Sequence, residues 1–139
     1  MTSGIVCVGN RFAERDALGP RVFDWLSKRP LPPDVMLVDG GLRGLDLLPI
    51  IEAWPRVVFV DACREPEIRE LAPPLESALE PEGWDHGAGL VYLLRVLPRV
   101  CEAKPPTWRL LCAGGEPDEA LVARVGARAI SLATDGSWS

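Results

Sequence analysis

Several features that assign a protein to a broad class are missing from this sequence. Every apolar run is interrupted by Pro, Arg or Asp well before the roughly 20 residues that span a bilayer, and Lys and Arg form no basic cluster. The 20 acidic residues outnumber the 15 basic ones, which gives a net charge of -5 and a pI near 4.9. Because such a surface repels phosphate backbones, we expect neither a membrane nor a nucleic acid as a partner.

Cysteine is scarce and scattered. The four cysteines, Cys7, Cys63, Cys101 and Cys112, include no Cys-x-x-Cys pair, so neither a disulfide framework nor a zinc knuckle is expected. Cys7 and Cys112 fall within apolar strand patterns, where a buried thiol behaves as a small hydrophobic group. Cys63 follows Asp61 by two residues, so it is either a plain buried thiol or a neighbour of a functional site.

The length of 139 residues, with 47% hydrophobic residues, fits a single domain over residues 1–139 with one core of ordinary size. The first four residues lead directly into an apolar strand, without the basic region or the small-residue cleavage site of a secretory signal. We therefore expect a cytoplasmic protein.

Short apolar segments alternate with segments of helical periodicity. Continuous apolar runs predict strands over residues 5–8, 35–38, 57–60 and 108–113, and a more exposed strand over 68–71. Apolar residues at helical spacing predict helices over 18–28, 45–51, 90–100 and 118–132, and the Pro- and Glu-rich residues 72–85 predict a surface excursion. Strands that are apolar throughout are buried on both faces, so we expect a three-layer α/β domain with helices on both faces of a mostly parallel, twisted sheet.

Three polar residues stand beside predicted buried elements: Asp16, Asp61 and His86, the only histidine. Ligands of open α/β sheets bind at the carboxyl ends of the strands. This rule places residues 10–16, 39–44, 61–64 and 114–116 along one edge of the sheet. His86 reaches the same edge if the loop before the helix at 90–100 folds back over it, and the three side chains would then form a site suited to metal chemistry.

Each of these residues also has a structural interpretation. Asp16 is suited to be the N-cap of the first helix; alternatively, Pro20 occupies the first helical position, Gly19 is the cap, and Asp16 is left in the loop. Asp61 is suited to cap the turn after its strand, and His86 to be an exposed loop residue. On these grounds alone both interpretations stay open.

Four blocks of sequence, taken in order, resemble the hydrogenase maturation proteases, the endopeptidases that trim the large subunit of nickel-iron hydrogenases. Residues 8–10 (Val-Gly-Asn) and 16–19 (Asp-Ala-Leu-Gly) are similar to the family's first strand and acidic loop. Residues 39–48 begin with Asp-Gly-Gly, by itself a tight turn with glycines at positive φ, and continue with Gly-Leu-Asp as in the family. Residues 60–62 (Val-Asp-Ala) and 86–90 (His-Gly-Ala-Gly-Leu) complete the set.

The resemblance implies a fold of the phosphorylase/hydrolase-like kind and an endopeptidase that removes the C-terminal extension of a nickel-iron hydrogenase large-subunit precursor. It implies that Asp16, Asp61 and His86 are the nickel-binding and catalytic residues, and the supporting residues would be Asn10, Asp39, Gly40 and Gly41. Nickel would arrive bound to the substrate, with other divalent metals able to replace it in vitro. The same resemblance implies a monomer. Arg15 departs from the family, which has a second acidic residue there.

Two carboxylates and one imidazole are hard and borderline ligands that suit a divalent first-row metal and leave coordination positions open. Either the metal polarises the scissile carbonyl or activates water, or one carboxylate is the general base and the metal serves recognition alone. A serine triad is excluded because no Gly-x-Ser-x-Gly elbow is present, and a dinucleotide site lacks its glycine spacing. The alternative function is a non-catalytic homologue that binds nickel or a partner during hydrogenase assembly.

Overall fold

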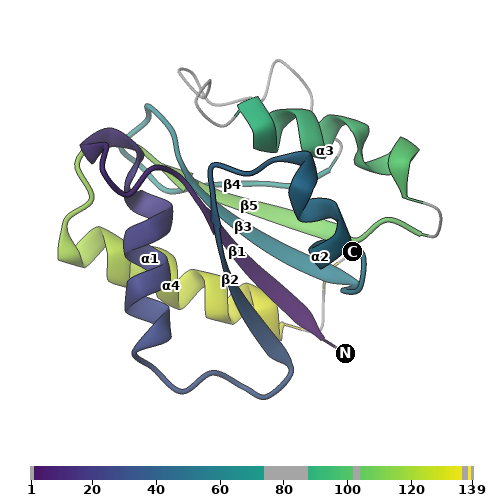
Figure 1. The fold of residues 1–139 in the computed structure, drawn as a ribbon. Helices are drawn as coiled ribbons and strands as arrows, with labels where there is room; N and C mark the ends of the chain where they lie inside the picture. Colours follow the sequence, from purple (N-terminus) through teal and green to yellow (C-terminus); the bar gives the residue numbers. More distant parts are fainter. Residues whose placement is uncertain (1, 74–87, 102–103, 136–137, 139) are drawn as a thin grey trace.

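The computed structural model of the chain describes residues 2–73, 88–101, 104–135 and 138 (Figure 1). The described strands are β1 (Ser3–Val8), β2 (Val35–Gly41), β3 (Arg56–Ala62), β4 (Arg69–Leu71) and β5 (Thr107–Ala113). The helices are α1 (Leu18–Ser27), α2 (Leu48–Ile51), α3 (Ala88–Val100) and α4 (Glu119–Thr134), with 3-10 turns η1 (Glu14–Asp16) and η2 (Leu45–Leu47).

The strands form one sheet in the order β2-β1-β3-β5-β4. β1 is parallel to both β2 and β3, β3 is parallel to β5, and only the short β4 is antiparallel to its neighbour β5. The chain therefore runs outward from β1 to β2 and then returns past β1 to β3. That reversal makes the carboxyl ends of β1 and β3 the topological switch point, where ligands of such sheets bind.

Two apolar cores lie on opposite faces of the sheet, because successive strand residues point to opposite sides. On one face Ile5 and Val58 pack with buried residues of α1 and α4, and on the other Val6 and Phe59 pack with buried residues of α2 and α3. Figure 1 shows α1 and α4 below the sheet and α2 and α3 above it. The predicted three-layer α/β architecture is thus confirmed.

The predicted elements are present with different boundaries. The helix expected over 45–51 is divided into η2 and the short α2, in which Pro49 lies in the first turn, where a missing N–H costs nothing. β2 and β3 are longer than their apolar runs, and each continues through an aspartate, Asp39 and Asp61. The predicted excursion over 72–85 lies mostly in residues 74–87, outside the described residues, and so does His86.

The described part of the chain contains no helix that is both long and apolar enough to cross a membrane. All four cysteines are free thiols, and Cys7, Cys63 and Cys112 are buried.

Candidate functional site

Asp61 ends the apolar part of β3 at the switch point. Its side chain is 0% exposed, and its Oδ1 accepts a hydrogen bond of 2.8 Å from the Ala62 backbone N–H. The sequence favoured Asp61 as a residue after its strand, but the parallel ladder with β5 continues through it and pairs it with Cys112. Burial of a carboxylate costs free energy unless polar groups compensate it. A wholly buried carboxylate at this end of the sheet indicates a role other than packing.

Asp16 lies one loop beyond β1, in η1, and is 8% exposed. The Asn10 N–H donates to both the Asp16 carboxylate, at 3.0 Å, and the Asp16 backbone carbonyl, at 3.0 Å. The loop closes tightly because Gly9 has a φ of +141°, and a Cβ at Gly9 would overlap the Asp16 carbonyl oxygen. Gly9 and Asn10, both in the first block of the resemblance, are therefore the residues that hold Asp16 at the end of β1.

The expected caps at the start of α1 were wrong. α1 begins at Leu18 with Ala17 as its N-cap, no side chain caps it, and Pro20 is its third residue. Gly19 is a helical residue instead of the cap, and a Cβ there would overlap the Val8 carbonyl oxygen. The helix begins at Leu18, as in the predicted range, and not at Pro20. Gly19 lets the first turn pack directly against β1, and the missing N–H of Pro20 costs nothing in that turn. Asp16 consequently remains in the loop.

Asp39, Gly40 and Gly41 form the end of β2 and a turn fixed by polar contacts. The Asp39 carboxylate accepts from the Gly41 N–H at 3.2 Å, and Arg43 donates to the Asp39 carbonyl at 2.7 Å and to the Gly40 carbonyl at 3.2 Å. Only Gly41 has the expected positive φ, +56°. Gly40 allows the end of β2 to lie close to the Val8 side chain of β1, because a Cβ at Gly40 would be only 2.8 Å from Val8 Cγ1.

The loops after β1 and β2 are joined to each other. The Gly9 N–H donates to the Gly41 carbonyl at 2.8 Å. Arg11 reaches the Asp39 carboxylate at 3.7 Å and makes a bidentate pair with Asp24 on α1, with a shorter distance of 2.7 Å. The segment that carries Asp16 is thus held in place by contacts with both β2 and α1, and Arg11 makes the contacts with both.

The first two predicted site residues lie on adjoining elements, because η1 contacts β3. The third, His86, is outside the described residues, so the three-residue site is still a prediction. Within the described ranges, no group of three or more His, Cys, Asp or Glu side chains could hold a metal ion. The two buried carboxylates offer hard oxygen ligands to a metal that brings other ligands with it.

Cys63 and Cys112 form a thiol pair beside Asp61 that the sequence did not predict. The hydrogen bond from Cys112 lowers the pKa of Cys63, whereas this bond and burial raise the pKa of Cys112. The Cys63 thiol also donates to the Glu65 carbonyl at 3.8 Å. The two cysteines are neighbours because β3 pairs with β5. They are nearly fifty positions apart in the sequence, so the sequence alone does not reveal this contact. Cys63 is therefore a buried thiol and also a neighbour of Asp61.

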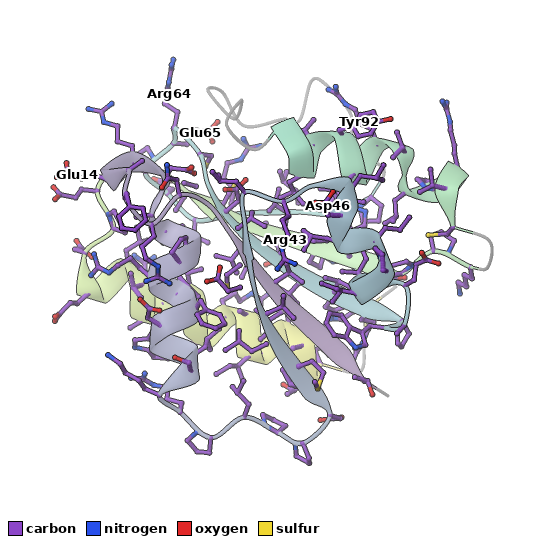
Figure 2. All side chains as sticks on the ribbon, viewed as in Figure 1. Glu14, Arg43, Asp46, Arg64, Glu65 and Tyr92 are labelled. Atoms are coloured by element: carbon purple, nitrogen blue, oxygen red, sulfur yellow. The ribbon has the colours of Figure 1, made fainter. Side chains whose placement is uncertain are left out.

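The departure at Arg15 lies on the surface, since Arg15 is exposed and the adjacent Asp16 is buried. Figure 2 shows Glu14 from η1, and Arg64 and Glu65 from the segment after β3, at the same end of the sheet. Gly114, after β5, belongs to this end as well, because a Cβ there would overlap the carbonyl oxygens of Cys63 and Arg64. Mixed charges therefore surround the two buried carboxylates.

Comparison with known proteins gives the class of this fold. No model of a protein family and no curated protein sequence matches the chain. Among solved structures it is similar to the hydrogenase maturating endopeptidase HybD from E. coli, with 24% identity, a TM-score of 0.71, and coverage of 95% of this chain and 89% of the other.

Two further structures agree. The hydrogenase 2 maturation peptidase from a Thaumarchaeota archaeon has 25% identity and a TM-score of 0.62, covering 95% of both chains. The endopeptidase HycI from Escherichia coli has 21% identity and a TM-score of 0.68, covering 100% of this chain and 96% of the other. The chain therefore has the α/β fold of the hydrogenase maturation proteases, and the resemblance drawn from the four blocks is confirmed at the level of the fold.

Proposed function

We propose that this protein is an endopeptidase that removes the C-terminal extension of a nickel-iron hydrogenase large-subunit precursor after nickel insertion. The observation that carries the proposal is the pair of buried carboxylates, Asp16 and Asp61, at the switch point of a sheet with the fold of maturation proteases. The three similar structures described above, all maturation peptidases or endopeptidases, support the reaction class.

In this proposal the nickel is part of the substrate. Asp16, Asp61 and His86 would complete the coordination of an ion that the precursor already holds, so that only a loaded precursor places its scissile bond correctly. The rigid, glycine-packed loop around Asp16 suits this task, because it fixes one oxygen ligand before the substrate arrives. Residues Asn10, Asp39, Gly40 and Gly41 would support the site through the two joined loops.

Hydrolysis adds a water oxygen to the carbonyl carbon, breaks the C–N bond and transfers a proton to the leaving amine. A carboxylate near the water can accept the first proton and return it to the amine, and the substrate's metal can polarise the carbonyl. Asp61 is the stronger candidate for the first role, because its position on a strand between two others holds it rigidly. The alternative division, in which the metal activates the water, uses the same residues.

The test compares the wild-type protein acting on nickel-loaded and nickel-free precursor, with the product masses read by mass spectrometry. We expect loss of a C-terminal segment from the loaded precursor and no cleavage of the nickel-free one. Binding of the loaded precursor without any cleavage would overturn the proposal and favour the alternative, a non-catalytic nickel- or partner-binding homologue in hydrogenase assembly. Sedimentation of the wild-type protein alone tests the proposal that it is a monomer.

A further inference from the structure

Half of the large exposed apolar side chains in the described residues lie on the segments that follow β1 and β2. Among the described residues the large exposed hydrophobic side chains are Phe12, Met36, Leu42, Leu45, Tyr92 and Val100. Phe12 is 93% exposed, Leu42 64% and Leu45 41%. These three, which we name the apolar rim, belong to the segments that follow β1 and β2 at the switch-point end. Met36, at the start of β2, and Val100, at the end of α3, lie at the opposite end.

The apolar rim is held in its exposed position. The Phe12 N–H donates to the Asn10 side chain at 3.0 Å, so the same turn that orders Asp16 turns Phe12 outward. Leu42 stands between Gly41, whose carbonyl accepts from Gly9, and Arg43, which is tied to the carbonyls of β2. An exposed apolar group on an ordered loop loses little conformational entropy when a partner covers it. Such groups are typical anchors of an interface.

The charges near the apolar rim indicate the chemistry of that partner. The exposed ionic side chains of these segments are three cations and three anions: Arg11, Arg15, Arg43, Glu14, Asp39 and Asp46. Arg11 is paired with two carboxylates, and Arg43 donates to backbone carbonyls. Figure 2 shows Arg43 and Asp46 in the segment after β2. Because these six exposed charges balance, they favour neither a basic nor an acidic stretch of polypeptide over the apolar rim, so we take apolar contact as the main source of recognition by the rim.

We infer that the apolar rim is the docking surface for an uncharged, apolar stretch of the substrate polypeptide next to the bond that is cut. This inference rests on the proposed function, because it takes the buried carboxylates as the place where that bond lies. Continuity supports it: the loop that carries Phe12 also carries Asp16, and its hydrogen bond to Gly41 joins it to the loop that carries Leu42. A chain covering Phe12 and Leu42 would therefore lie beside the carboxylates.

The experiment compares two double variants of the full chain. Phe12→Ser with Leu42→Ser removes two anchors of the apolar rim, and Met36→Ser with Val100→Ser removes two exposed apolar groups of the opposite end. We expect the first to raise KM for nickel-loaded precursor about tenfold or more, with kcat within about twofold of wild type, because anchors of this kind contribute mainly to binding. We expect the second to match wild type. Circular dichroism and Tm establish that both are folded.

Equal KM values for the two double variants would overturn the inference while leaving cleavage, and so the proposed function, intact. If wild type binds the precursor without cleaving it, the proposed function fails, and the Kd measured by biolayer interferometry takes the place of KM. In that case about a tenfold weaker Kd for the rim variant alone supports the docking surface. A third outcome is that wild type is a dimer and the rim variant is a monomer, with KM and Kd unchanged. This result would identify a second copy of the chain as the partner that covers the apolar rim, and it would overturn the inference. A precursor neither bound nor cleaved by wild type overturns both proposals.

Discussion

The two ends of the sheet use their polar groups in different ways. At the amino end, the Arg56 side chain donates to the backbone carbonyls of Asp135 and Ala133, and the guanidinium groups of Arg56 and Arg109 each lie 5.0 Å from the Trp138 ring. The Trp138 indole N–H donates to the Leu132 carbonyl at 2.8 Å. These contacts join the end of α4 and Trp138 to β3 and β5, so they stabilise the fold.

At the carboxyl end, two of the polar side chains are buried carboxylates, and backbone N–H groups donate to them. Asp16 accepts a hydrogen bond from the Asn10 N–H, and Asp61 accepts one from the Ala62 N–H. The backbone around them is packed so closely that a Cβ at Gly9, Gly19 or Gly114 would overlap a neighbouring carbonyl oxygen. The comparison indicates that the polar groups of the amino end stabilise the fold, whereas those of the carboxyl end hold two carboxylates in position for a substrate. Three substitutions can break or sharpen this distinction.

The largest effect is expected from Gly19→Ala at the carboxyl end. Its Cβ would overlap the backbone of Val8, which cannot move without shifting β1, so we expect a loss of about 3 kcal/mol in the free energy of unfolding. Gly4→Ala at the amino end is the matched control. Its Cβ would meet the Trp54 ring, which can rotate, so a smaller loss is expected. Urea denaturation measures both, and a greater loss for Gly4→Ala would contradict the rigid packing of α1 on β1.

A smaller effect is expected from Trp138→Ala at the amino end. Removal of the ring takes away two cation–π contacts and a hydrogen bond, so the free energy of unfolding should fall by about 2 kcal/mol. Because these contacts are remote from the carboxylates, kcat/KM for precursor cleavage should stay at the wild-type value at a temperature where the variant is folded. A lowered kcat/KM would show that the two ends do not divide their roles as described.

The smallest effect is expected from Asp118→Ala, a carboxylate at the same end as Asp61 but with a structural role. Its side chain accepts from the Leu121 N–H at 2.8 Å and caps α4, so its loss should cost about 1 kcal/mol of stability. Asp118→Asn should recover most of this loss, because asparagine is an equally good cap. Normal cleavage by both variants would separate a capping carboxylate from a catalytic one. Impaired cleavage by the stable Asp118→Asn would place Asp118 in the functional site.

Much of the architecture could be predicted from the sequence. The apolar runs at 5–8, 35–38, 57–60 and 108–113 became the four parallel strands, because short continuous apolar runs are typical of strands in a parallel sheet. The edge strand β2 has the same kind of run although it is only partly buried. The end of the sheet that holds Asp16 and Asp61 also followed, since parallel strands bring their carboxyl ends to one edge. The ordered blocks led to the right fold class, which the similar structures confirm.

What could not be predicted depends on contacts between distant segments. The first residue of α1 was predicted correctly, but its N-cap was not, because the sequence does not reveal that Gly19 packs on Val8. The Cys63 and Cys112 pair was missed because neighbouring strands are not consecutive in the chain. His86 lies among residues 74–87, so its place in the site remains a prediction.

The central claim is that Asp16 and Asp61 act on the substrate instead of stabilising the fold. The most direct measurement is the single-turnover rate of nickel-loaded precursor cleavage by Asp16→Asn, Asp61→Asn and His86→Ala, with Asp118→Asn as the control. We predict rates at least about 100-fold below wild type for the first three, with precursor binding still detectable, and a wild-type rate for the control. Wild-type rates for both Asp16→Asn and Asp61→Asn would contradict the account.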